Sequence, residues 1–198
     1  MRRVVVLALL AMVLPMAAWA DGITLTNKYG TISIQDSGIA SKGSQLTSFN
    51  GITAPPGHSL GTVSYSTGAL VSGSIAAGGV FSSAGSTFDV VGKGNFGEPK
   101  GPIFTGGFTG NIDWTLVSHV GQTYVFTLSG DLTGQLYNGV MVTGSTTQTI
   151  TTHPGQLNQG VGHITLGNTQ LTTPEPGTLG LLGTGLLGIA GMFRRKKS

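Results

Sequence analysis

Short runs that alternate apolar and polar residues recur along the middle of this chain, and they constrain its fold more than any other feature. Each run places its apolar side chains on one face at a period of two residues, as a half-buried strand does. The runs are Ile23–Leu25, Ile32–Ile34, Phe88–Val90, Ile112–Leu116 and Tyr124–Leu128. The region carries no stripe of helical period. The sequence therefore predicts an all-β fold, with a single antiparallel β-sandwich or barrel-like domain.

Segments rich in Gly, Asn and Ser separate the runs and have the composition of turns. We expect turns at Asn50–Gly51, Ser129–Asp131 and Asn138–Gly139. Two longer segments, 37–56 and 92–101, have few alternating apolar residues and contain prolines. They predict loops, of which the first is loose.

The best-defined strand pair joins residues 111–118 to residues 122–129. A short connection of this kind predicts a hairpin whose neighbouring side chains share one face. Trp114 would then face the same core as Tyr124 or Phe126. Because Trp114 alternates with other apolar residues, we expect it in the core and not at a binding surface.

The amino terminus has the three parts of an export signal. Arg2 and Arg3 precede an apolar run over residues 4–14, and the small-residue site Ala18-Trp19-Ala20 follows. The run is too short to span a bilayer as an anchor, and its flank is the site that signal peptidase cuts. We expect a signal peptide over residues 1–20 that the export machinery engages, with Ala18 and Ala20 as the signal-peptidase site.

The remaining residues 21–173 predict one extracytoplasmic β-rich domain, long enough to bury a core. The formal net charge of +3 arises from the chain ends. Residues 21–173 themselves hold six acids and four lysines. They offer no basic patch, so we expect no nucleic-acid partner.

The carboxyl terminus combines three features in a fixed order. A Pro-Glu-Pro triplet at residues 174–176 keeps the backbone extended, an apolar span runs from Leu179 to Phe193, and four basic residues follow. As a helix the fifteen-residue span reaches only about 22 Å against a hydrocarbon core of about 30 Å. The basic residues resist translocation and hold their end in the cytoplasm. Residues 174–198 therefore predict a separate tail with a short transmembrane helix.

This tail closely resembles the PEP-CTERM sorting signal of Gram-negative bacteria, over about 25 residues and none of the domain. The resemblance implies an exosortase-type membrane protease that removes the tail, and a body released to or attached at the cell surface, often alongside exopolysaccharide. The protein would be membrane-anchored before processing and at the cell surface or extracellular after it. Implied sorting-signal residues are Pro174, Glu175 and Pro176, and the implied basic stop signal is Arg194, Arg195, Lys196 and Lys197. An ordinary short stop-transfer anchor is the alternative, because short spans persist by thinning the bilayer.

Two glycine-rich motif matches lack the context that their chemistry needs. Residues 57–61 fit G-x-S-x-G, which requires a strand, a sharp turn and a helix, but prolines precede Ser59 and an alternating segment follows it. A serine hydrolase would also need a histidine and an acid within hydrogen-bond reach of Ser59. Residues 92–97 fit G-x-G-x-x-G, but prolines beyond them stop the helix that would hold a pyrophosphate. The sequence predicts no catalytic residue and no cofactor.

Metal ligation has little support in the residue spacing. No cysteine is present, and no pair of histidines has the two-to-five-residue spacing common in zinc sites. We expect Asp89 and Asp113 at outward strand positions and Asp131 in a turn, and therefore no metal site.

Two classes of function fit these features. The first is a structural or adhesive protein of the cell surface or extracellular matrix, without enzymatic activity. The alternative is a carbohydrate-binding module for exopolysaccharide, in which exposed aromatic rings stack on sugars. Phe96 and Tyr137, both in glycine-containing loops, are the candidate ligand contacts. Exposure of both rings on one face would favour sugar binding, and burial of both would favour the structural role.

Overall fold

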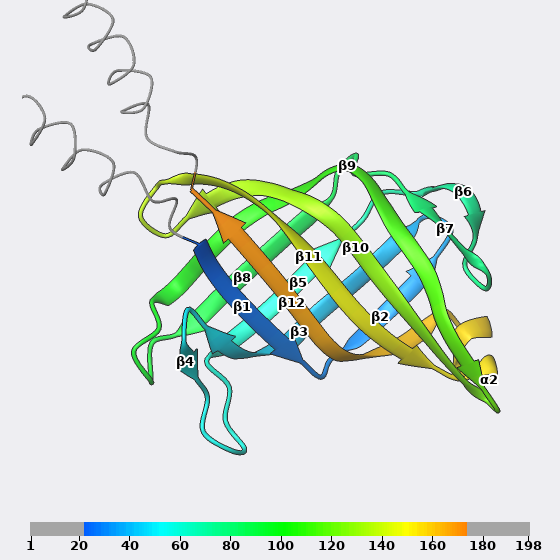
Figure 1. The fold of residues 1–198 in the computed structure, drawn as a ribbon, viewed down its shortest axis with the longest axis horizontal. Helices are drawn as coiled ribbons and strands as arrows, with labels where there is room; N and C mark the ends of the chain where they lie inside the picture. The colour runs from blue at the N-terminus through cyan, green and yellow to red at the C-terminus, as the bar shows by residue number, and fades with distance from the viewer. Residues whose placement is uncertain (1–21, 174–198) are drawn as a thin grey trace, which may run out of the picture. The chain divides into compact units, whose positions relative to one another are not determined.

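In the computed structural model, which describes residues 22–173, this part of the chain forms twelve strands and one short helix (Figure 1). The strands are β1 (Gly22–Lys28), β2 (Thr31–Gln35), β3 (Gly38–Phe49), β4 (Ile52–Thr53), β5 (Gly61–Ser66), β6 (Leu70–Ser74), β7 (Gly78–Phe81), β8 (Thr87–Lys93), β9 (Lys100–Val120), β10 (Thr123–Leu136), β11 (Met141–Thr152) and β12 (Val161–Thr172). The helix α2 (Pro154–Asn158) joins β11 to β12. The predicted all-β class is confirmed.

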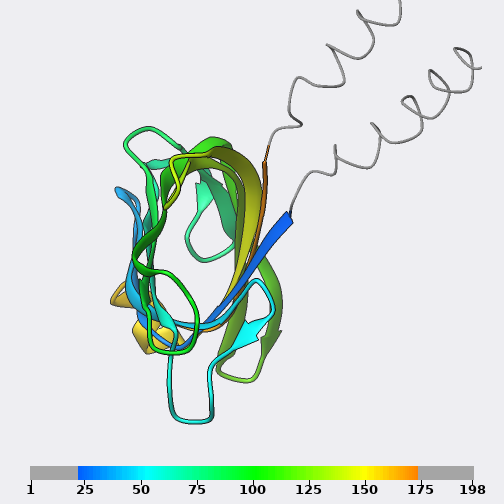
Figure 2. The same cartoon turned by 90° about the vertical axis from the view of Figure 1, so that its left-hand side faces the viewer.

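Eight of the strands close into an antiparallel barrel. Neighbours follow the order β10-β11-β12-β1-β3-β5-β8-β9, and β9 pairs with β10 to complete the ring. Figure 2 shows this ring from one end. The long strand β9 pairs first with β8 and then, over residues 112–115, with β7, so that β6 and β7 form a ribbon beside the barrel. Of the two predicted architectures, the structure is therefore the barrel.

Apolar side chains alternate into the barrel and fill its interior. The largest fully buried side chains include Trp114, Tyr65, Phe81, Phe88, Phe104 and Phe126. The predicted hairpin is confirmed as the β9–β10 pair, in which the rings of Trp114 and Phe126 stack with centroids 4.4 Å apart. The ring of Tyr124 also stacks on that of Phe126, with centroids 6.4 Å apart. The core placement predicted for Trp114 is correct.

A layer of buried amides and hydroxyls also lies inside the barrel. Asn27 Nδ2 donates to Ser44 Oγ at 2.8 Å and to Gln148 Oε1 at 2.9 Å. Gln148 Nε2 donates to Thr146 Oγ1 at 2.8 Å, and the Thr146 hydroxyl lies 2.8 Å from that of Thr169. A buried polar group without a hydrogen-bond partner destabilises the fold. The network therefore favours the strand register in which these side chains of β1, β3, β11 and β12 meet.

Two predictions about loops and turns were wrong. Residues 37–56, expected to form a loose loop, contain β3, which pairs with β1, β2 and β5. Two of its buried side chains, Ser41 and Ser44, are polar, and a bulge between them shifts the pairing with β5. Both features interrupt the alternation of apolar residues from which a strand is predicted. Residues 129–131, expected to form a turn, lie within β10 at a bulge in its pairing with β9. Asp131 is therefore an exposed strand residue.

The predicted signal peptide with Ala18 and Ala20 and the predicted tail with its sorting and stop signals lie outside the described residues. The boundaries predicted for the domain stay a prediction. Between residues 22 and 173, the structure has no helix of the length and apolar character needed to cross a membrane.

Candidate functional site

Three loops gather at one end of the barrel, which we call the loop end. They comprise residues 50–60, which contain β4, residues 94–99 between β8 and β9, and residues 137–140 between β10 and β11. Gly61 pairs with Gly92 just inside the first two loops, and Tyr137 N–H donates to the Ile103 carbonyl at 2.9 Å beside the third. In Figure 1 the loop end lies in the left half of the picture.

Both predicted ligand contacts lie at the loop end. The Phe96 side chain is 38% exposed and the Tyr137 side chain 59% exposed. The ring of Phe96 packs edge-on against the imidazole of His58, with centroids 5.7 Å apart, which links the second loop to the first. The structure thus exposes both aromatic residues at the same end of the barrel.

A buried carboxylate shapes the loop that carries Phe96. Glu98 Oε1 accepts a hydrogen bond from Asn95 N–H and Glu98 Oε2 accepts one from Phe96 N–H, both at 2.9 Å. Burial alone would raise the pKa of this carboxyl, but the backbone hydrogen bonds outweigh it and hold the pKa below its usual range. The charged form of Glu98 therefore holds Phe96 in place.

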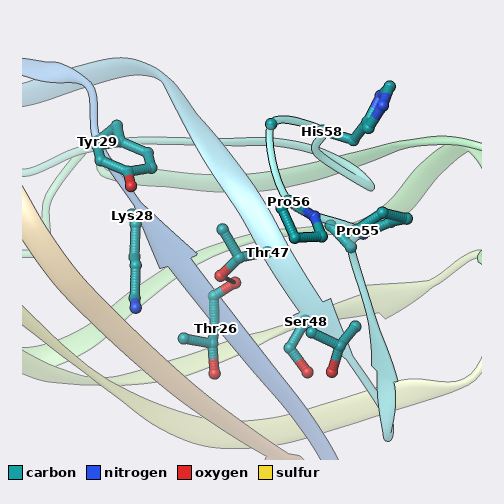
Figure 3. Close-up of a pocket in the computed structure, with 11 residues that line it drawn as sticks. Thr26, Lys28, Tyr29, Thr47, Ser48, Pro55, Pro56 and His58 are labelled. Carbon is teal, nitrogen blue, oxygen red and sulfur yellow. Dashed lines mark hydrogen bonds between the residues drawn. The ribbon is translucent and has the colours of Figure 1, made fainter.

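A groove of about 420 Å³ opens beside the loop end, between the first loop and the outer face of β1 and β3. Figure 3 shows Tyr29 and Lys28 on one side of it, Pro55 and Pro56 on the other, and Thr47 between them. Its remaining lining residues are Thr26, Ser48, Thr53, Ala54, Gly57 and His58. The groove therefore combines an aromatic ring, proline rings, hydroxyls and an ammonium group. His58, which lies at its rim, also contacts Phe96.

Tyr29 was not among the sequence-derived candidates, although it is the most exposed of the three aromatic residues at 63%. It is the first residue of the break Tyr29–Gly30 between β1 and β2, with φ of 62° at Tyr29 and 100° at Gly30. The two strands do not pair with each other, and both run antiparallel to β3 and β12, so β2 continues the path of β1 past the break. Positive φ favours glycine or asparagine, because a larger side chain is strained there. The sequence signal was available, since an aromatic residue next to a glycine interrupts two alternating runs.

Ser59, the serine of the G-x-S-x-G match, lies in the first loop and is 8% exposed. Its Oγ accepts a hydrogen bond from Lys93 Nζ at 2.7 Å, while the ring of the adjacent His58 packs on Phe96. Strand β5 follows the serine, where a nucleophile elbow would need a helix.

Between positions 22 and 173, no three His, Cys, Asp or Glu residues group as metal ligands. His119 stacks on Tyr124 with centroids 4.0 Å apart, and His153 Nδ1 lies 2.8 Å from the Gln122 carbonyl. A shallow depression of about 600 Å³ on the outer face of β10 to β12 is lined by Asp131, threonines and other residues, none of them aromatic.

Comparison with known protein families identifies the end of the chain. The family model of the PEP-CTERM protein-sorting motif matches residues 172–196. This segment is a PEP-CTERM sorting motif. A PEP-CTERM motif marks an exported protein that an exosortase sorts to the cell surface, as the tail predicted. The match includes Pro174, Glu175 and Pro176 but only the last residue of β12, so it says nothing of what the barrel does. No match to the chain was found among curated proteins or solved structures.

Proposed function

We propose that this protein is a structural and adhesive component of the cell surface or extracellular matrix, and that it adheres by binding exopolysaccharide at the loop end of its barrel. One observation carries the proposal: Phe96 and Tyr137 are both exposed at the same barrel end. Aromatic rings are rigid, and an exposed face of such a ring suits stacking on a sugar. The sorting motif supports it by bringing the barrel to the compartment that holds extracellular polymers.

The loops are suited to binding without large ordering costs. Two backbone N–H groups on the Glu98 carboxylate fix the Phe96 loop, and Tyr137 is tied to Ile103 through its own N–H. Preorganised contacts lose less conformational entropy when a ligand binds. A flexible polysaccharide would thus meet aromatic residues whose backbone is already fixed.

We propose further that the protein has no enzymatic activity. The hydrogen-bond partner of Ser59 Oγ is an exposed lysine, and His58 next to it is turned to Phe96. A Ser59→Ala protein that lost a hydrolase activity present in the wild type would refute this part of the proposal.

Co-sedimentation of the full-length chain, kept in mild detergent, with exopolysaccharide from the native host tests the binding role. We expect the wild type to sediment with the polymer and the Phe96→Ala/Tyr137→Ala double variant to stay largely in solution. Val71→Ala/Val117→Ala is the matched control, because both valines are exposed hydrophobic residues on strands away from the loop end. A wild type that does not sediment, or a double variant that sediments equally, contradicts the proposal.

A further inference from the structure

We propose that the groove between Tyr29 and the prolines of the first loop is a subsite for a carboxylate-bearing sugar, a hexuronate residue of an anionic polysaccharide. This inference rests on the proposed carbohydrate binding and names the class of sugar. The groove lies beside the loop end, and His58 belongs both to its rim and to the contact with Phe96. A chain of sugars bound at Phe96 would therefore continue into it.

Tyr29 forms one wall, and it is held there against the preference of its backbone. Its φ of 62° is unfavourable for a bulky residue, and asparagine or glycine would adopt this backbone conformation with less strain. Gly30 cannot take a side chain, because a β-carbon there would meet the Ser44 backbone at 2.9 Å. An exposed ring kept in a strained position beside a groove is the pattern of a functional residue.

Pro55 and Pro56 form the opposite wall, on a turn that is already rigid. His58 N–H donates to the Pro55 carbonyl at 3.0 Å, and Gly57 has a φ of 79°, which is the geometry of a type II turn with Pro56 and Gly57 at its centre. Ala54 N–H donates to the Thr47 carbonyl at 2.9 Å, which fixes the start of the turn on β3. A sugar ring between Tyr29 and these prolines would have an apolar surface on both sides.

Hydroxyl groups line the floor. Thr47 Oγ1 donates to the Thr26 carbonyl at 3.1 Å, which leaves its oxygen free to accept from a ligand. Ser48 and Thr53 stand beside the prolines in the same lining. The volume of about 420 Å³ lies in the ordinary range of small-molecule sites. These groups suit the ring hydroxyls of a hexose.

Charge selects the class of sugar. Lys28 carries the one permanent charge among the described residues that line the groove, and none of those residues is an acid. The ammonium group of an exposed lysine attracts an anion without the fixed bidentate geometry of arginine. A sugar with a carboxylate at its C6 position would satisfy it, whereas a neutral hexose would leave it unpaired.

Titration calorimetry of the full-length chain, in mild detergent, with two matched hexasaccharides tests the inference. One is β-1,4-linked hexamannuronate and the other is neutral β-1,4-linked mannohexaose, which differ at C6 alone. We expect hexamannuronate to bind at least about tenfold more tightly at low salt. The advantage should shrink at about 0.5 M salt, since exposed charge pairs are screened.

Three variants separate the contributions of the groove. Tyr29→Asn removes the ring and relieves the backbone strain at positive φ, so it should weaken the binding of both sugars about tenfold or more while the protein stays folded. Lys28→Gln should weaken hexamannuronate binding far more than mannohexaose binding, so that the preference between the two sugars disappears. Lys42→Gln is the control, because Lys42 is also exposed and lines a different depression. It should behave as the wild type does.

The outcomes distinguish this inference from the proposed function. In one outcome, the wild type co-sediments with host exopolysaccharide while Tyr29→Asn leaves the affinity for both hexasaccharides unchanged. That result overturns the groove as a sugar subsite and leaves the loop end as the binding site. A preference for mannohexaose overturns the charge argument. A protein that binds neither hexasaccharide nor host exopolysaccharide overturns the proposed function together with the inference.

Discussion

Asn27 and Gln148 exchange two amide hydrogen bonds inside the barrel, at 2.9 Å and 3.3 Å. They belong to β1 and β11, which are not neighbours, and both are in register with Gly167 of the intervening strand β12. A β-carbon at Gly167 would meet Gln148 Oε1 at 2.1 Å and Asn27 Oδ1 at 2.2 Å. The missing side chain of one strand thus makes room for an amide pair between its two neighbours.

Gly167→Ala should therefore destabilise the barrel strongly. The methyl group would overpack the interior and separate two buried amides, and together these effects should cost about 2–4 kcal/mol of unfolding free energy. Urea denaturation of the full-length chain, followed by circular dichroism, measures the loss. Gly155→Ala is the control, since a β-carbon at that glycine of α2 meets no atom within 4 Å. Equal stability of the two variants would show that the amide pair is not tightly enclosed.

Trp114 should contribute through two separable interactions. Its ring stacks on Phe126, and its Nε1 donates to the Ile75 carbonyl at 2.8 Å, which ties the β6–β7 turn to the barrel. We expect Trp114→Ala to cost about 3–5 kcal/mol and Trp114→Phe, which keeps an aromatic ring, distinctly less. Denaturant midpoints of both variants measure this. A Trp114→Phe protein as unstable as Trp114→Ala would mean that ring stacking contributes little.

The sequence predicted the parts of the fold in which apolar residues face inward without interruption. The β9–β10 hairpin was found because Trp114 and Phe126 stand in clean alternation. Strand β3 was missed because two of its buried side chains, Ser41 and Ser44, read as exposed until the partners across the barrel are known. Single-strand patterns cannot reveal a partner that lies far along the chain.

The candidate site was predicted in part, for a similar reason. Phe96 and Tyr137 were found as aromatic residues in glycine-containing loops, but their common barrel end follows from strand pairing. Tyr29 was missed because its role depends on Pro55 and Pro56, which lie on a different loop. The groove exists only after β1 and β3 pair.

Tyr65→Phe should leave the barrel as stable as the wild type or more so. The Tyr65 hydroxyl and its register partner Ser41 are buried, and neither oxygen has a hydrogen-bond partner in the structure. Burial raises the pKa of this hydroxyl, so it stays neutral and unpaired. Removing it should raise the unfolding free energy by up to about 1 kcal/mol, as urea denaturation would show. A clear loss of stability would reveal a partner for the hydroxyl.

Stability should fall when acid protonates Glu98. The folded-state pKa of this carboxyl lies below the usual value of a glutamate, so its contribution to stability is complete above about pH 4.5 and is lost as the pH falls through the lower folded value. Denaturant midpoints measured between pH 7 and about pH 3 should show this loss in the wild type. Glu98→Gln, which cannot serve both backbone N–H groups as an acceptor, should be less stable at pH 7 and lack this component of the acid-dependent loss. An identical pH profile in the two proteins would exclude the role given to Glu98.

The intact mass of the protein recovered from the medium, the cell surface and the membranes of its native host tests the whole account most directly. We predict a surface or matrix species that begins at Asp21 and ends near Pro174–Pro176, with any added mass showing what the body is attached to. A membrane species that still carries Arg194 to Ser198 as the sole form would make the tail an ordinary anchor. It would contradict the account of a processed, matrix-bound protein.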